Sequence, residues 1–375
     1  MLGKNVKTKY RKINIDENKR ILFISDIHGD LKLFKRALQK VDYRSEDYLF
    51  LIGDIIEKGT ENLDILDYLK KFKEENPNVY LLSGNCDEVF RFIIPPVDKE
   101  KFLYYALEKR HSIINEMAIR LNVTITNETN VDELCTRFYN EFKYYYDFID
   151  TFDDVININD KIILVHAGIM NINNIPENKM DVLKLDNFYF KSPAQNKLMI
   201  VGHYPTINYC KRISSLNPIF DFKKNIICID GGNNVCRYGQ LNVVILDSLK
   251  NYKFSFKSVD HFPKIKILKD INYTSNEKPF CLITGENEVK ILDVIGDFAY
   301  CEQLCSGRRL YVYEQWIYRR GGKLYAYDAT NLFVPFKAGS IVTLILYAQP
   351  FCIVKKEGVL ALVRTKDLVM QDATA

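Results

Sequence analysis

The chain has 375 residues, 47% hydrophobic and 27% charged, a composition typical of a globular protein with a sizeable core. Its 52 basic and 48 acidic residues leave a net charge of +4, so the charge balance does not indicate binding to nucleic acid. The longest apolar runs, such as residues 341–346, are much shorter than the roughly 20 residues of a membrane span, and we expect no membrane partner.

Nine cysteines are spread along the chain without a Cys-x-x-Cys pair, and most of them lie inside apolar runs. An odd number of thiols in such positions favours reduced, buried side chains over disulfides. We therefore expect a cytoplasmic protein.

Strands and helices alternate in the first part of the chain. Residues 21–24 form an apolar run that predicts a buried strand, and residues 31–41 carry apolar side chains at helical spacing. A second strand is predicted at 48–52, a second helix at 63–72 and a third strand at 79–82. This order is typical of an α/β sheet whose functional residues gather at the strand ends.

Residues 90–152 then change to a helical and strongly aromatic pattern, which predicts two or three helices that cover the sheet or form a wall of the site. Strands resume at 162–165, 198–201, 226–229 and 241–246. The first part of the chain is therefore predicted as one α/β domain with a helical insert or cap.

Polar residues follow the predicted strands at six positions: Asp26, His28, Asp54, Asn85, His166 and His203. A single His at a strand end is more often a hydrogen-bonding residue, and Asp or Asn beside Gly commonly forms a turn. The joint occurrence of six such residues favours a shared site. Oxygen and imidazole ligands without a thiolate suit Mn²⁺, iron or Zn²⁺. Two ions at close range need a bridging carboxylate, for which Asp54 is the candidate.

Five motifs carry a family resemblance: Ser-Asp-Ile-His-Gly, Gly-Asp-Ile-Ile-Glu-Lys-Gly, Gly-Asn-Cys-Asp, Val-His-Ala-Gly and Gly-His-Tyr-Pro, at residues 25–29, 53–59, 84–87, 165–168 and 202–205. In this order they resemble the calcineurin-like metallophosphoesterase superfamily, most closely its phosphoprotein phosphatase and diadenosine tetraphosphatase branch. The resemblance covers roughly residues 20–250 and implies a β-sandwich flanked by helices.

The resemblance also implies two divalent cations, with Mn²⁺ expected and iron or Zn²⁺ as alternatives. It assigns one cation to Asp26, His28 and Asp54, and the other to Asp54, Asn85, His166 and His203. Because Pro205 stands where other branches of the superfamily have a second His, the first cation should complete its shell with water.

Three departures from the family pattern concern the expected catalytic residues. Cys86 replaces the His that protonates the leaving oxygen in most members, and Glu57 replaces the Asp that orients this His. Either the Cys86 thiol donates the proton or the acid is lost, which would slow the release of poor leaving groups by about 10²–10⁴-fold. Lys58 replaces a phosphate-binding Arg, so it keeps the charge but loses the bidentate geometry.

The composition changes beyond residue 255. We expect a catalytic domain at 1–255, a linker at 256–279 and a small all-β region at 280–375 with two repeats. Its strand pattern resembles Src-homology-3-like barrels, a class that binds peptides, glycans or a neighbouring domain. The C-terminal region is therefore a candidate binding site for a peptide or protein partner.

The functional prediction is a phosphoesterase that uses two metal ions to activate water, of the serine/threonine protein phosphatase kind. The expected substrate is a phosphorylated protein. One alternative is hydrolysis of diadenosine polyphosphates or of another nucleotide phosphoanhydride or phosphodiester. The second alternative, which Cys86 and Glu57 keep open, is a catalytically weakened metal-binding scaffold with a C-terminal binding module.

Overall fold

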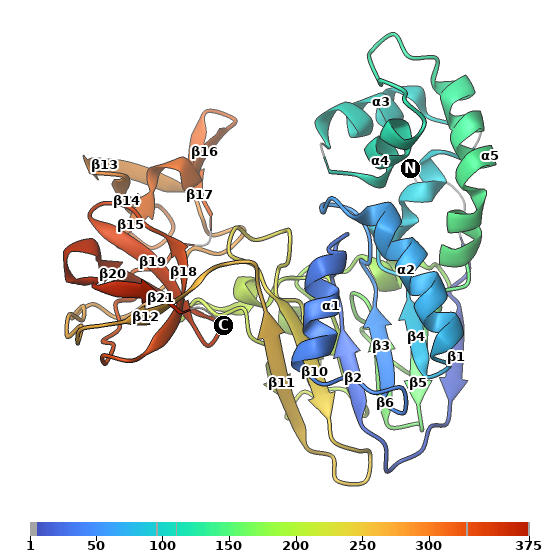
Figure 1. Cartoon of the computed structure of the whole chain (residues 1–375), viewed down its shortest axis with the longest axis horizontal. Coiled ribbons are helices and arrows are strands. Elements are labelled where there is room, and N and C mark those ends of the chain that lie inside the picture. The colour runs from blue at the N-terminus through green and yellow to red at the C-terminus, as the bar shows by residue number, and fades with distance from the viewer. Residues whose placement is uncertain (1–5, 95–96, 110, 328, 374–375) are drawn as a thin grey trace. The chain divides into compact units, whose positions relative to one another are not determined.

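A computed structural model describes residues 6–94, 97–109, 111–327 and 329–373 (Figure 1). The chain forms two compact units. The first comprises Met1–Tyr204 and Pro218–Val259, and the second comprises Pro205–Asn217 and Asp260–Ala375. Residues from the middle of the chain are therefore part of the C-terminal unit.

The first unit contains a five-stranded sheet with the order β11-β10-β2-β3-β4. Its strands are β2 (Ile21–Ile24), β3 (Tyr48–Ile52), β4 (Val79–Leu82), β10 (Leu241–Leu246) and β11 (Phe254–Val259). Strands β2, β3 and β4 are parallel, whereas β10 pairs antiparallel with both β2 and β11. The parallel register brings the ends of β2, β3 and β4 to the same edge of the sheet.

A six-stranded sheet with the order β1-β5-β6-β7-β9-β8 completes the first unit. Its strands are β1 (Tyr10–Ile13), β5 (Val155–Ile158), β6 (Ile162–Val165), β7 (Leu198–Val201), β8 (Ile219–Asp221) and β9 (Ile226–Cys228). Strands β6, β7 and β9 are parallel to one another. The strands predicted at 162–165 and 198–201 are confirmed, and the strand predicted at 226–229 ends one residue earlier.

The two sheets share one hydrophobic core because successive side chains of a strand point to opposite faces. In β2, Ile21 and Phe23 pack in a cluster with Leu164 and Ile200 of the second sheet. Leu22 and its neighbours on the other face pack in a cluster with the helices. The mixed α/β class predicted from the sequence is confirmed.

The helices of the first unit follow the predicted pattern (Figure 1). They are α1 (Leu31–Lys40), α2 (Asn62–Glu75), η1 (Asp87–Phe92), α3 (Lys99–Glu108), α4 (Ile113–Arg120), α5 (Val131–Ile149), α6 (Met180–Leu183) and α7 (Phe188–Lys191). Asp30 caps α1 by accepting a hydrogen bond from the Leu33 amide at 3.0 Å, and Ser112 and Asn130 cap α4 and α5 in the same way. Within the described ranges, no helix combines the length and the apolarity that a bilayer crossing requires.

The second unit is all-β apart from short 3₁₀-helices in the described residues. Its sheets have the orders β20-β19-β18-β12-β21, β13-β14-β15 and β16-β17. The strands are β12 (Lys264–Ile267), β13 (Val289–Ile295), β14 (Phe298–Gln303), β15 (Arg309–Tyr313), β16 (Ile317–Arg320), β17 (Lys323–Ala326), β18 (Ile341–Leu346), β19 (Phe351–Lys356), β20 (Val359–Arg364) and β21 (Met370–Asp372). The 3₁₀-helices are η2 (Thr206–Tyr209), η3 (Glu314–Trp316) and η4 (Thr365–Asp367).

This region contains the antiparallel pairs β13–β14 and β18–β19. Each pair has a register shift, between Ile291 and Asp293 in the first and between Leu344 and Leu346 in the second. The interval 256–279, expected as a linker, contains the end of β11 and the whole of β12. The all-β character is as predicted, and the assignment to Src-homology-3-like barrels stays a prediction.

Candidate metal centre

The six predicted ligands lie in loops that follow five strands. Asp26 and His28 follow β2, Asp54 follows β3, and Asn85 follows β4. His166 follows β6 and His203 follows β7. All are buried except Asn85 and His203, which are partly exposed. Because parallel strands end at one edge, the loops bring these side chains together from both sheets.

A first group consists of Asp26, His28 and Asp54. Nε2 of His28 lies 3.9 Å from Oδ1 of Asp26 and 3.8 Å from Oδ2 of Asp54. Oδ1 of Asp26 is buried and has no hydrogen-bond partner among the described residues. A buried carboxylate oxygen is rarely left without a partner, so this atom fits a cation ligand.

A second group faces the other oxygen of Asp54. Nε2 of His166 lies 3.3 Å from Oδ1 of Asp54, and the His166 and His203 rings meet edge to face with their centroids 5.1 Å apart. The side-chain oxygen of Asn85 lies 2.8 Å from Nδ1 of His203 and 3.2 Å from the Leu183 carbonyl oxygen. These are three acceptors without a proton among them. Rotating the Asn85 amide lets its NH₂ group donate to both atoms, and its oxygen then accepts a hydrogen bond from the Cys86 amide at 3.2 Å. As a metal ligand, Asn85 would turn its oxygen to the cation.

Hydrogen bonds on the far side of the imidazole rings orient the nitrogen atoms. Nδ1 of His28 lies 3.4 Å from the Ile56 carbonyl, and Nδ1 of His166 lies 2.9 Å from the Ile52 carbonyl. When these Nδ1 atoms carry the proton and donate it, both Nε2 lone pairs point to the centre. Nε2 of His203 lies 3.0 Å from Oδ1 of Asp186, which leaves Nδ1 of this ring for the ligand side.

The backbone at the candidate ligands is strained. Asp26, His28, Asp54 and His203 have φ angles of 55°, 52°, 50° and 67°, in the left-handed region that most side chains avoid. Such conformations cost about 1–3 kcal/mol each and concentrate at functional sites. Close packing adds a further constraint, because a Cβ atom on Gly202 would lie 2.3 Å from Oδ2 of Asp26.

Burial and neighbouring charges together set the protonation of the centre. Burial raises the pKa of Asp26 to about 6. Burial also raises the pKa of Asp54, but the charge and hydrogen bond of His166 lower it well below its ordinary value. Burial disfavours the charged form of His166, yet the Asp54 carboxylate raises the pKa of this imidazole to about 10. Without metal, the His166 proton thus neutralises Asp54, and a cation would take its place. The donor set fits a pair of divalent cations.

The ammonium group of Lys58 lies at the first group, with Nζ 3.4 Å from Nε2 of His28. Desolvation of this ammonium group disfavours its charge, but the nearby carboxylates of Asp54 and Asp26 raise the pKa of Lys58 above its ordinary value. The centre therefore attracts positive charge. The Lys58 side chain is long and lies near the centre, where a phosphate group would need a counter-charge.

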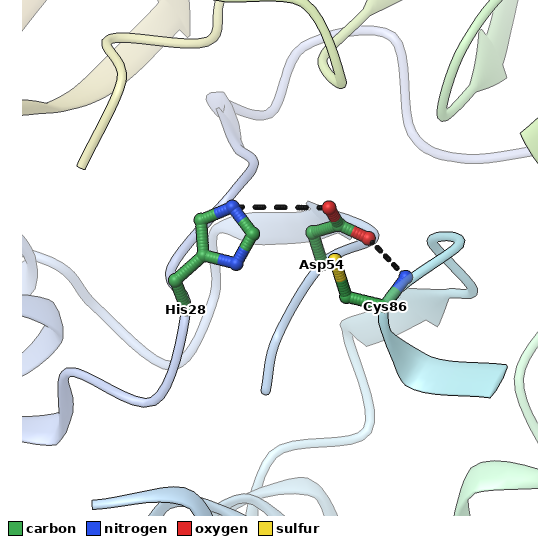
Figure 2. A group of neighbouring side chains, drawn as sticks. All are labelled: His28, Asp54 and Cys86. Carbon is green, nitrogen blue, oxygen red and sulfur yellow. Dashed lines mark hydrogen bonds and ion pairs between the residues drawn. The ribbon is translucent and has the colours of Figure 1, made fainter. Parts of the chain in front are cut away.

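Glu57 and Cys86 were predicted as a functional pair. The Glu57 carboxylate accepts hydrogen bonds from the hydroxyl of Tyr105 and from the Ile113 amide, so that it is turned toward the helical insert. Cys86 lies beside Asp54, whose Oδ1 accepts a hydrogen bond from the Cys86 amide at 2.8 Å (Figure 2). Burial raises the pKa of the Cys86 thiol well above its ordinary value.

Sequence reasoning assigned no role to Asp87. Its carboxylate accepts hydrogen bonds from the amides of Ile55, Ile56 and Gly84 at 2.9, 3.2 and 2.7 Å, so that it joins the loop after β3 to the loop after β4. Its place in the Gly-Asn-Cys-Asp motif was the available signal.

Buried charges behind the centre were also missed. Lys179 forms ion pairs with Glu88 at 2.6 Å and Asp154 at 3.1 Å, and donates a hydrogen bond to the Ser83 hydroxyl. Asp230, which follows β9, has a buried Oδ2 without a hydrogen-bond partner among the described residues. The Asp-Gly-Gly sequence at 230–232 signalled a loop at a strand end, but not the proximity of Asp230 to the centre.

The sequence matches the family of Calcineurin-like phosphoesterases over residues 19–245. The match covers more than half of the chain, and the chain belongs to this family, whose members depend on a pair of metal ions. All six candidate ligands lie within the matched residues.

Characterised relatives match shorter segments. The symmetrical bis(5'-nucleosyl)-tetraphosphatase of Buchnera aphidicola is 36% identical over 66 residues, or 17% of this chain and 23% of that protein. Serine/threonine-protein phosphatase 2 of Escherichia coli is 35% identical over 65 residues, 17% of this chain and 30% of that protein. The asymmetrical bis(5'-nucleosyl)-tetraphosphatase PrpE of Anoxybacillus flavithermus is 25% identical over 156 residues, 39% of this chain and 56% of that protein. The matched segments thus span less than two thirds of these relatives.

Solved structures similar to this chain include a protein serine/threonine phosphatase from Saccharomyces cerevisiae, with a TM-score of 0.43, 11% identity and coverage of 68% of this chain and 84% of that chain. Another is a cold-active protein-tyrosine phosphatase from Shewanella, with a TM-score of 0.39, 13% identity and coverage of 68% and 83%. These scores are low, and the family assignment rests on the sequence match.

Proposed function

We propose that this protein hydrolyses phosphate esters or anhydrides with two divalent cations held by Asp26, His28, Asp54, Asn85, His166 and His203. The observation that carries the proposal is the position of Asp54 between two ligand groups. Its Oδ2 faces His28 at 3.8 Å, and its Oδ1 faces His166 at 3.3 Å. One carboxylate that faces two groups suits a shared ligand of two ions.

Residues around the proposed metal centre have separate roles. Bound ions supply Lewis-acid activation of water and of the phosphoryl oxygens. Lys58 holds the non-reacting oxygens of the phosphate through its ammonium group. Asp87 keeps the loops that carry Asp54 and Asn85 in register through its three amide hydrogen bonds.

The candidate substrate classes differ in how strongly their leaving groups need a proton. A proton donor is most effective when its pKa lies near the working pH. Burial moves the pKa of the Cys86 thiol away from this range, and Glu57 is engaged by the insert instead of orienting a donor. We therefore infer that the substrate has a leaving group that needs no proton. A nucleotide phosphoanhydride or an aryl phosphate meets this condition, whereas the alkoxide of phosphoserine or phosphothreonine does not.

The experiment measures the products formed by the full chain after metal removal and reloading with Mn²⁺: p-nitrophenolate, free nucleotides or phosphate, according to the substrate. We expect turnover of p-nitrophenyl phosphate and of a dinucleoside polyphosphate, and at least tenfold slower turnover of a phosphoserine peptide. Asp54→Asn and His203→Ala should reduce the activity below detection, because the first removes the negative charge of the shared ligand and the second removes an imidazole ligand. Asp147→Asn, an exposed carboxylate on α5, is the matched control and should retain the wild-type rate.

Equal rates for wild type and Asp54→Asn would refute the assignment of the site. Turnover of the phosphopeptide as fast as the anhydride would instead leave the metal centre intact and overturn the argument about the leaving group. Two bound metal ions without activity on any substrate of the panel would favour the scaffold alternative.

A further inference from the structure

The thiol of Cys86 faces the same point as two candidate metal ligands. A ligand nitrogen of His28, a carboxylate oxygen of Asp54 and Sγ of Cys86 all lie within 4.8 Å of one another (Figure 2). The hydrogen bond from the Cys86 amide to Oδ1 of Asp54, at 2.8 Å, fixes the cysteine next to this carboxylate. The three residues come from the loops after β2, β3 and β4, so the convergence is produced by the tertiary fold.

A second observation points to a ligand at the same place. Oδ1 of Asp26 is buried, lacks a hydrogen-bond partner within the described ranges, and lies 3.9 Å from Nε2 of His28. Burying a carboxylate oxygen without a partner is costly. The ammonium group of Lys58 also lies here, with Nζ 3.4 Å from Nε2 of His28. The site therefore has an unsatisfied carboxylate oxygen and lies beside a cationic group.

We propose that Cys86 is the fourth protein ligand of the first cation and binds it as a thiolate together with Asp26, His28 and Asp54. This inference rests on the proposed function, because it requires the same dinuclear centre. On binding, the thiol proton is released to solvent and the sulfur donates its electron pair to the cation. The cysteine then fills the coordination position that the sequence assigned to water.

The oxygen and nitrogen atoms allow this coordination after a small closure, and the sulfur, which lies within 4.8 Å of the ligand atoms of His28 and Asp54, must move closer to them. With metal–sulfur bonds of about 2.3 Å and metal–nitrogen or metal–oxygen bonds of about 2.0–2.2 Å, neighbouring ligand atoms of a tetrahedral site lie roughly 3.5 Å apart. The separations of 3.8 and 3.9 Å around His28 exceed this by a few tenths of an ångström. A set of two carboxylates, one imidazole and one thiolate suits Zn²⁺ or Co²⁺ better than Mn²⁺.

The two metal positions should therefore differ. The second group, with Asn85, His166 and His203 beside Asp54, has only oxygen and nitrogen donors. We expect the first position to prefer the softer cation of a mixture. In this arrangement the sulfur binds the metal and does not protonate a leaving group, which agrees with the preference for substrates that leave without a proton.

The test is an anaerobic Co²⁺ titration of the metal-free full chain, followed by absorption spectroscopy. We expect a near-ultraviolet thiolate-to-cobalt charge-transfer band that saturates at one cobalt per chain, beside the visible bands of two bound cobalt ions. Cys86→Ser and Cys86→Ala should lose the charge-transfer band and keep visible cobalt absorption. Cys305→Ser, which removes an exposed thiol, is the matched control and should keep both.

A charge-transfer band that persists in both Cys86 variants would overturn the proposal, and so would its absence from wild-type protein with two bound cobalt ions. Failure of the wild type to bind cobalt would refute the metal centre itself, and the proposed function with it.

In competition with a chelator, Cys86→Ser should weaken the tightest Zn²⁺ site by at least about tenfold and Mn²⁺ binding by less than about threefold. Equal weakening for the two metals would contradict a thiolate ligand.

Discussion

Several residues of the candidate metal centre adopt an unfavourable backbone conformation. Four of the six candidate ligands have φ angles between 50° and 67°, and Glu57 and Lys58 in the next turn have φ angles of 74° and 70°. Left-handed conformations at non-glycine residues persist only where surrounding contacts impose them. Here the Asp87 carboxylate, through its bonds to the amides of Ile55 and Ile56, holds the turn between Asp54 and Glu57.

Lys58 provides a test at this scale. Lys58→Met keeps much of the side-chain volume and removes the charge that we assign to phosphate binding. One charge-assisted hydrogen bond contributes about 1.5–3 kcal/mol, so kcat/KM for p-nitrophenyl phosphate should fall about 10–100-fold. Binding of Mn²⁺ should not weaken, because the ammonium group competes with a cation for His28. Steady-state kinetics and metal titration measure the two effects.

Lys58→Arg should recover most of the lost kcat/KM, since it restores the charge. Lys143→Met, an exposed lysine on α5, controls for the loss of a surface charge. Unchanged kcat/KM in Lys58→Met would contradict the phosphate-binding role.

Local sequence patterns marked the candidate ligands more readily than the residues around them. Asp26 and His28 could be found because they directly follow an apolar strand and are separated by a single residue. The contacts of Glu57 could not be found in this way, because its hydrogen-bond partners lie 48 and 56 positions further along the chain. Those contacts depend on how the helical insert packs, which no local pattern specifies.

At the scale of secondary structure elements, two acidic side chains attach the helical insert to the domain. Glu57 accepts hydrogen bonds from α3 and from the start of α4. Glu116 of α4 accepts hydrogen bonds from the amides of Asn62 and Leu63 at the start of α2, at 3.0 and 2.9 Å. Carboxylates at a helix N-terminus are favourable, so α4 also stabilises α2.

The attachment through Glu57 should depend on pH. Burial raises the pKa of Glu57 from 4.5 to about 7, so the folded state binds this proton more tightly than the unfolded state. The stability from this group is therefore present below pH 4.5 and is lost as pH rises to about 7. The loss is up to about 3 kcal/mol. Hydrogen exchange of residues 99–109 and 111–120, corrected for intrinsic rates, should show easier opening at pH 8 than at pH 5.

Glu57→Gln should remove this dependence, because the amide stays neutral, accepts from the Ile113 amide and donates to the Tyr105 hydroxyl. Glu141→Gln, an exposed position on α5, should leave the pH dependence at its wild-type value. The same change in opening free energy between pH 5 and 8 in wild type and Glu57→Gln would refute the role of Glu57.

At the scale of the whole molecule, the boundary between the two units does not follow chain order. The segment Pro205–Asn217 lies inside the family match, yet it is part of the second unit. Leu216 donates an amide hydrogen bond to the Gly358 carbonyl, and Leu360 donates one to the Ser214 carbonyl, both at 3.0 Å. The segment begins two residues after His203. A chain shortened to the family match would therefore leave the Leu216 amide and the Ser214 carbonyl without these partners.

The alternation of apolar strands and turns predicted a change to an all-β structure near residue 255. It could not predict that residues 205–217 are part of the second unit. Strand periodicity reports which side chains are buried, whereas the partner of an irregular segment depends on tertiary packing. Ser214 and Ser215 have no apolar pattern that would mark them as neighbours of β20.

Two glycines test the attachment of Pro205–Asn217. Gly358 and Gly339 have φ angles of +76° and +87°, so alanine at either position incurs backbone strain of about 1 kcal/mol. A Cβ atom on Gly358 would lie 1.9 Å from Oδ1 of Asn217, whereas one on Gly339 meets nothing within 4 Å. We expect Gly358→Ala to accelerate hydrogen exchange in residues 205–217, because Asn217 must give up its hydrogen bond to the Glu357 carbonyl. Gly339→Ala should leave exchange in that segment unchanged. Equal exchange in the two variants would contradict the attachment of this segment through Asn217.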